Sequence, residues 1–381
     1  MKRTRPVTAP ASLYRLLPAL LLFALALLSG CGDHRPITIG FIAGTSGRVA
    51  DLGISGLDAV QLAIAERNDR GGIDGRPLRL ITVDDQQNPQ RAKSVAQQLV
   101  DQGIEIVIGP MTSDMGMAVA PILDRAGVVN VSPTVTTQRL SALDDHFFRV
   151  SATTSAYAGR SATFQLRPGG MRRIVAIIDA NNRSFTQNWL DNFSTPFTAG
   201  GGEVVATVAF DTSQARPLAA VVGEALGRSI DGVLIIANSM DAALLCQQIR
   251  KTDPNVPVTL ADWGATERLL ELGGKAVEGV TVVQTFDRDN PGPKYQKFRQ
   301  AYIERYQREP GFPGVYAYDA AQVVLTALAQ RKRGETLKQT ILRIRVFKGL
   351  QGDFSFDDHG DVEREQASIS IVRDRKFIVI D

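Results

Sequence analysis

The chain has few of the residues that usually carry covalent or metal chemistry. Its 381 residues include two cysteines and three histidines. The patterns G-x-S-x-G, H-E-x-x-H, G-x-G-x-x-G and Walker A do not occur, which excludes the common signatures of hydrolases, zinc proteases and nucleotide-binding enzymes. His34 stands in a short polar segment, and His146 and His359 stand in polar turns beside acidic residues. We therefore expect no catalytic residues, no metal site and no cofactor.

The chain also lacks a real excess of basic charge. Its formal charge is +3, but Lys2, Arg3, Arg5 and Arg15 all lie in the first 15 residues, and without these four the charge is −1. The remainder therefore has no basic surplus of the kind that neutralises phosphates. The composition predicts no nucleic-acid partner.

The first 30 residues have the organisation of an export signal. A basic start precedes the apolar run Leu16–Leu28, which is too short to span a bilayer comfortably. The tetrapeptide Leu28-Ser29-Gly30-Cys31 resembles a bacterial lipobox, which implies removal of residues 1–30 and lipidation of Cys31. Residues 31–36 would then form a tether, and the membrane would be reached only through this lipid anchor. The alternative is an uncleaved anchor with an incidental cysteine.

Apolar strand-like runs alternate with helical patterns over nearly the whole remaining chain. The expected strands of the first half are Ile37–Ala43, Leu78–Asp84, Ile104–Ile108, Val128–Val131 and Phe147–Val150. The same alternation resumes at Thr154, with strands expected at Ile174–Ile178, Glu203–Phe210, Gly232–Ile236, Val256–Leu260 and Gly279–Thr285. Such alternation predicts parallel sheets covered by helices on both faces. Because the chain is longer than one core usually serves, we expect an α/β protein with two similar domains.

Two hydroxyl residues follow neighbouring strands of the first half. Ser113 stands at the start of a helix after Ile104–Ile108, and Thr136 lies in the turn after Val128–Val131. Ligands of open α/β sheets bind beyond the carboxyl ends of the strands, and a helix N-terminus favours an anion there. This stretch is therefore a candidate socket for a carboxylate. The alternative is that Ser113 only caps its helix and Thr136 only shapes a turn.

Several segments together resemble a known family. They are ITIGFIAGTSG from Ile37, GGIDGRP, VDDQQNP, VIGPMTSD, NVSPTVT and YAYDA. In their order and spacing the chain from Ile37 onward is similar to type I periplasmic solute-binding proteins of the Leu/Ile/Val-binding class, the receptors of ABC importers. The resemblance implies two doubly wound parallel-sheet lobes joined by a three-strand hinge, with crossings near Thr153, Thr285 and Gly352. Lobe 1 would comprise residues 37–153 plus 286–351, and lobe 2 residues 154–285 plus 352–381.

The resemblance also implies ligand-binding residues. In lobe 1, Ser113 and Thr136 would hold the ligand carboxylate, the carbonyl of Thr134 would accept from its ammonium group, and Leu52 would line the pocket. In lobe 2 the sequence departs from the family. Asn238 stands at an aromatic pocket position, and Phe185 or its neighbour Ser184 stands at another. The disulfide of the family is absent, since Gln87 and Thr112 occupy its positions.

The acidic position that pairs with a ligand ammonium is the most informative departure. It falls on Asp262 or Trp263, depending on a shift of one residue. Asp262 would complete a site for an amino acid, because a buried ammonium needs an opposite charge. Trp263 would instead offer a flat apolar wall for a ring or an aliphatic acid, or pack within its lobe. Arg48 and Arg183 lie on loops expected near the cleft, where each could bind a second carboxylate or face solvent.

These features predict a receptor outside the cytoplasm that captures an amino acid or a related small carboxylate by hinge closure. Its expected partners are the ligand and an ABC permease in the inner membrane. The alternative is a ligand-sensing or regulatory envelope lipoprotein of the same fold without a transport role.

Overall fold

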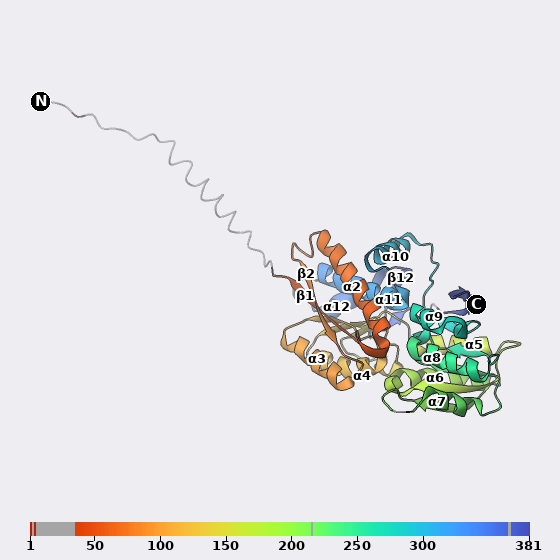
Figure 1. Ribbon diagram of the computed structural model, residues 1–381. Coiled ribbons are helices and arrows are strands. Elements are labelled where there is room, and N and C mark those ends of the chain that lie inside the picture. Colours follow the sequence, from red (N-terminus) through yellow and green to blue (C-terminus); the bar gives the residue numbers. More distant parts are fainter. Residues whose placement is uncertain (2–3, 5–34, 215, 365–366) are drawn as a thin grey trace.

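The computed structural model describes residues 1, 4, 35–214, 216–364 and 367–381. The expected signal peptide, the expected lipidation site Cys31 and most of the expected tether lie outside the described residues. The folded part consists of two lobes lying side by side, with the orange and pale blue elements in one and the green elements in the other (Figure 1). No helix in the described ranges combines the length and the apolar character needed to cross a membrane.

Lobe 1 is built on a five-stranded parallel sheet. Its strands are β1 (Ile37–Ala43), β2 (Leu78–Asp84), β3 (Ile106–Ile108), β4 (Val129–Ser132) and β5 (Phe147–Arg149), in the order β2-β1-β3-β4-β5. Alternate residues of β1 bury on opposite faces, with Phe41 in one apolar cluster and Ile42 in another. Both faces are therefore covered, one by α2 (Ala50–Asp69) and α11 (Gly311–Gln330), the other by α3 (Pro89–Asp101) and α4 (Ser113–Arg125).

Lobe 2 repeats this arrangement with a larger, mixed sheet in the order β15-β14-β10-β9-β8-β6-β7. Its parallel strands are β6 (Arg173–Asp179), β7 (Glu203–Phe210), β8 (Gly232–Ile236), β9 (Val258–Leu260) and β10 (Thr281–Gln284). The hairpin of β14 (Ser368–Arg373) and β15 (Lys376–Val379) adds antiparallel to β10. Helices α5 (Thr154–Gln165) and α6 (Arg183–Ala199) cover one face, and α7 (Leu218–Leu226), α8 (Ser239–Thr252) and α9 (Glu267–Gly273) the other. The predicted α/β fold with two parallel-sheet lobes is confirmed.

A C-terminal segment returns to lobe 1 before it joins lobe 2. After α10 (Pro293–Tyr306), α11 and α12 (Leu337–Ile344), the strands β11 (Val346–Gly349), β12 (Gly352–Phe356) and β13 (Val362–Glu363) form a small antiparallel sheet. Phe356 buries edge-to-face against Phe148 of β5, with ring centroids 5.4 Å apart. The last passage between lobes thus lies between β13 and β14, later than the sequence prediction near Gly352, because Phe354 and Phe356 pack into lobe 1.

The strand order places the carboxyl ends of strands from the two lobes against each other. In lobe 1 the order reverses between β1 and β3, and in lobe 2 between β6 and β8. Such switch points open a crevice beyond the strand ends in doubly wound sheets. The segments that follow β1, β3 and β4 therefore face those that follow β6, β8 and β9.

Candidate functional site

Residues from both lobes enclose a small cavity at these strand ends, which we call the first chamber. Its volume is about 20 Å³, about enough for one water molecule. Most of the predicted ligand residues line it: Leu52, Ser113 and Thr134 from lobe 1, and Phe185, Asp262 and Trp263 from lobe 2. The sequence reasoning missed the other lining residues, which are Met111, Thr112, Asn182 and Phe312.

The lobe 1 end of the chamber carries hydroxyl groups and a helix N-terminus. Ser113 is the first residue of α4, is 1% exposed, and its Oγ accepts a hydrogen bond of 3.3 Å from the backbone N–H of Thr137. The Thr134 hydroxyl donates to the carbonyl of Met111 at 2.5 Å. Thr136 is buried but does not line the chamber, and its Oγ1 has no hydrogen-bond partner among the described residues.

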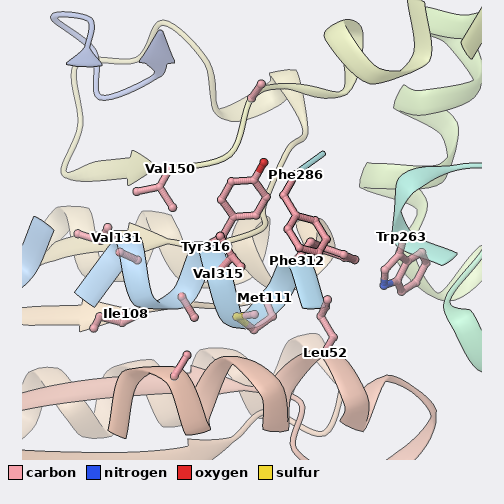
Figure 2. Packing of buried hydrophobic residues seen from close by; sticks show 14 of the residues in the cluster. Leu52, Ile108, Met111, Val131, Val150, Trp263, Phe286, Phe312, Val315 and Tyr316 are labelled. Atoms are coloured by element: carbon pink, nitrogen blue, oxygen red, sulfur yellow. The ribbon is translucent and has the colours of Figure 1, made fainter. Parts of the chain in front are cut away.

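The lobe 2 end carries a buried carboxyl group and an indole ring. Asp262 accepts a hydrogen bond of 2.9 Å from the indole N–H of Trp189, and its burial raises the pKa of the carboxyl group to about 7. Trp263 packs edge-to-face on Phe185 with ring centroids 5.5 Å apart. It lies opposite Leu52, Met111 and Phe312 (Figure 2). The structure thus places both Asp262 and Trp263 at the chamber, whereas the sequence prediction offered them as alternatives.

A second chamber of about 200 Å³ lies next to the first, and Trp263 lines both. Asn238 lies here rather than in the first chamber. Its Nδ2 donates to Asp241 at 2.6 Å, and its Oδ1 accepts from the backbone N–H of Asp241 at 2.9 Å, so it caps α8. The other residues around the second chamber are Ser46, Gly47, Arg48, Val49, Gln86, Gln87, Asp179, Asn181 and Thr212.

Two helices cap each other across the cleft. The carboxylate of Asp114, in α4 of lobe 1, accepts hydrogen bonds from the backbone N–H groups of Arg183 (3.0 Å) and Ser184 (2.8 Å) at the start of α6. In return the Oδ1 of Asn182 accepts from the N–H of Asp114 at 3.0 Å. Capping residues are visible in a sequence, but these two serve the helix of the opposite lobe, so the local pattern could not reveal their partner.

Further polar contacts join the lobes beside the second chamber. Asp51 of α2 accepts from the hydroxyls of Ser239 (2.6 Å) and Thr266 (2.7 Å) in lobe 2. Arg48 forms an ion pair with Asp241, so the carboxylate of Asp241 balances its positive charge in the cleft. The side chain of Arg183 is exposed, as in the solvent-facing alternative.

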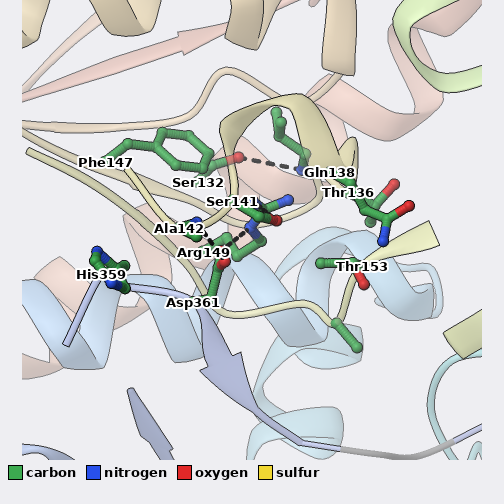
Figure 3. A network of polar contacts seen from close by, with 12 residues as sticks. Ser132, Thr136, Gln138, Ser141, Ala142, Phe147, Arg149, Thr153, His359 and Asp361 are labelled. Atoms are coloured by element: carbon green, nitrogen blue, oxygen red, sulfur yellow. Dashed lines mark hydrogen bonds and ion pairs between the residues drawn. The ribbon is translucent and has the colours of Figure 1, made fainter. Parts of the chain in front are cut away.

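A buried arginine supports the turn that carries Thr136. Arg149 is fully buried, and its burial lowers the pKa of the guanidinium group. The nearby carboxylate of Asp361 acts in the opposite direction and raises this pKa. Its Nη1 donates to the carbonyl of Thr137 at 2.8 Å, its Nη2 donates to Ser141 at 2.9 Å, and its Nε pairs with Asp361 at 2.6 Å (Figure 3). The turn is thereby fastened to lobe 1.

Larger hollows lie elsewhere on the molecule. A hollow of about 990 Å³ lies at the amino ends of β1 and β2, near Arg79, Glu105 and Lys332, and contains none of the predicted ligand residues. Within the described ranges, no group of His, Cys, Asp or Glu side chains could hold a metal ion. Cys246 is buried, as expected of a small apolar side chain.

Curated relatives match most of this chain. It is 24% identical over 340 residues to the Leu/Ile/Val-binding protein BraC3 of Rhizobium johnstonii, covering 88% of this chain and 91% of that protein. It is 22% identical over 349 residues to the Leu/Ile/Val-binding protein of Escherichia coli K12, covering 89% and 93%.

Solved structures share the fold. The leucine-binding protein LivK of Thermotoga maritima superposes with a TM-score of 0.82 at 23% identity, covering 91% of this chain and 98% of that one. A solute-binding protein of an ABC transporter from R. palustris, in complex with benzoate, gives a TM-score of 0.81 at 18% identity, covering 91% and 95%.

A sequence model of the periplasmic binding proteins matches residues 36–372 of this chain. That family has a binding role and works outside the cytoplasm. Its two-lobed fold and interlobe cleft are those described above. The chain belongs to the periplasmic binding protein family.

Proposed function

We propose that this protein is the extracytoplasmic receptor of an ABC importer and captures an amino acid or a related small carboxylate between its lobes. One observation carries the proposal. The first chamber joins hydroxyl groups and a helix N-terminus of lobe 1 to a buried carboxyl group of lobe 2 without an ion-pair partner among the described residues. The first end suits a carboxylate and the second an ammonium group. The names of the relatives, which cite leucine, isoleucine, valine and benzoate, agree with this class.

Each lobe has its own part in the proposed mechanism. The ligand carboxylate binds first on lobe 1, at Ser113 and the N-terminus of α4. The carbonyl of Thr134 and the carboxylate of Asp262 then receive an ammonium group. Closure brings Trp263 and Phe185 over the ligand and excludes water, which strengthens these polar contacts. The ligand favours the closed state by the amount of binding free energy that it gains there beyond its binding to the open state.

A thermal-shift screen of the chain from residue 32 onward tests the proposal. A ligand that binds only the folded state raises its stability in proportion to the logarithm of ligand concentration. We expect such a shift with amino acids, aliphatic acids or aromatic acids. A lack of any shift across all three classes would contradict transport and favour the regulatory lipoprotein.

The carboxylate socket is tested by Ser113→Ala. Loss of a hydrogen bond to a charged group should weaken binding by about 1–3 kcal/mol, measured by titration calorimetry with a ligand from the screen. Ser94→Ala, on the exposed face of α3, is the matched control. Unchanged affinity in Ser113→Ala would remove the assignment of Ser113.

We also propose that Cys31 carries a lipid that holds the receptor at the cell envelope beside its permease. The support is the sequence Leu28-Ser29-Gly30-Cys31 after an apolar run. The natural protein should partition with membranes, and Cys31→Ser should release it to the soluble fraction. If the Cys31→Ser variant stays on membranes, the apolar segment is instead uncleaved and anchors the protein itself.

A further inference from the structure

The first chamber alone cannot hold a whole ligand. Its volume of about 20 Å³ corresponds to about one water molecule, whereas the adjoining second chamber has about 200 Å³. Trp263 forms part of the wall of both. A ligand whose charged end binds in the first chamber therefore finds room for its other end in the second.

The chambers are close enough for a short side chain to reach from one to the other. Thr112 lines the first and Gln87 the second, and the Thr112 hydroxyl donates to Gln87 Oε1 at 2.9 Å. Asn181 and Asn182 are chain neighbours that line the second and the first chamber respectively. The walls of the two chambers are therefore formed by residues that contact each other directly or follow each other in the chain.

Three residues that line the second chamber carry hydrogen-bonding groups that are not fully used. Asp179 is 2% exposed and forms no ion pair among the described residues. Its Oδ2 accepts only a long hydrogen bond of 3.4 Å from Asn238. The Nε2 of Gln87 is buried without a partner within the described chain. The indole N–H of Trp263 forms no hydrogen bond there either, but it keeps contact with solvent.

We propose that the second chamber receives a ligand side chain that ends in a carboxamide or ureido group. This inference rests on the proposed function and names the substrate class of the same cleft. The C=O of the ligand accepts from Gln87 Nε2 or the indole N–H of Trp263, and its NH2 group donates to Asp179. Asp179 and one of the two N–H donors then gain a partner without the burial of a further charge.

Other side chains fit these groups less well. An apolar end leaves the buried Nε2 of Gln87 without a partner and Asp179 Oδ2 with only its long hydrogen bond from Asn238, and buried polar groups without good partners cost stability. A carboxylate end lies beside Asp179, which is a like charge, while Arg48 is already paired with Asp241. An ammonium end satisfies Asp179 but turns more donors toward Gln87 and Trp263.

The test compares three amino acids of nearly equal length by titration calorimetry, with benzoate as a fourth ligand. We expect glutamine to bind at least tenfold more tightly than methionine and glutamate. Equal or tighter binding of methionine or glutamate overturns the proposal. Binding of benzoate alone also overturns it but leaves the proposed function standing. Binding of none of the four overturns the inference, whereas the proposed function fails only if the wider thermal-shift screen shows no ligand.

Two variants locate the effect in the second chamber. Gln87→Glu keeps an oxygen for the Thr112 hydroxyl but loses the N–H donor, and Asp179→Asn keeps the shape but loses the charge. Each should weaken glutamine binding at least fivefold and leave methionine binding within twofold, which also shows that the variant is folded. Gln97→Glu, exposed on α3, is the matched control. An equal loss for glutamine and methionine, or no loss for glutamine, in both variants contradicts the proposal.

Discussion

At the scale of single residues, Asp262 decides which class of ligand the first chamber favours. Burial raises the pKa of its carboxyl group to about 7, so both protonation states are accessible near neutrality. The ionised form suits a ligand ammonium, whereas the neutral form can donate a hydrogen bond to a carboxylate. The sequence indicated the residue but not this state, which depends on the surrounding burial and on Trp189.

The pH dependence of binding should therefore differ between ligand classes. An ammonium group binds the ionised form, so amino-acid affinity should be full above pH 7 and fall up to about tenfold per pH unit below it. An acid without an amino group should show the opposite trend and bind more weakly as the pH rises through 7. Calorimetry from pH 5.5 to 8.5 with leucine and benzoate measures both trends. Asp262→Asn should flatten them, and a slope that persists in this variant would assign the effect to another group.

Arg149 should matter for stability more than its distance from the ligand suggests. It is fully buried and holds Thr137, Ser141 and Asp361 together. Arg149→Met should lower the free energy of unfolding by about 3–5 kcal/mol, the usual cost of breaking a buried ion pair, measured by urea denaturation. Arg139→Met, on the same turn, is the control, since it lacks such a network. A loss below about 1 kcal/mol would show that the Arg149 network is energetically neutral.

At the scale of elements, most of the fold was predictable because each strand is a short apolar run bounded by turn residues. The return of the C-terminal segment to lobe 1 was not predictable in this way. Phe354 and Phe356 alternate as in any strand, and only the position of Phe148 shows that they bury in lobe 1. The same limit applies to Asp114 and Asn182, which look like ordinary capping residues. Contacts between distant elements depend on how the lobes close, which a local pattern does not encode.

The reciprocal capping of α4 and α6 should stabilise the closed cleft. Asp114→Ala removes two hydrogen bonds from a carboxylate to the N-terminus of α6, which are stronger than neutral ones. We expect a larger radius of gyration of the free protein by small-angle X-ray scattering, because roughly 1–2 kcal/mol of closure energy is lost. Asp101→Ala, exposed at the end of α3, is the control. An unchanged radius would mean that these caps do not bias closure.

At the scale of the whole molecule, the two switch points explain why reasoning from sequence found the cleft but not its division into chambers. Ser113, Thr134 and Asp262 follow strand ends, so topology alone brings them near one another. Asn238 follows such an end too, but its side chain turns to cap α8 and stays in the second chamber. Which side chains finally meet depends on packing around Trp263 and Phe185, and no spacing rule predicts that.

The same geometry predicts how binding proceeds in time. The first chamber is too small for a ligand until the lobes separate, and hydrogen bonds from Asp51 and Asp114 hold them together. Opening should therefore limit the rate of binding when ligand is abundant. The chain has two tryptophans: Trp263 lines both chambers and Trp189 donates to Asp262, so their fluorescence should report binding without a label. In stopped-flow mixing, the observed rate should become independent of ligand concentration, and Asp114→Ala should raise that limiting rate by about tenfold. A rate that increases linearly over the whole concentration range would show that ligand enters without waiting for the lobes to open.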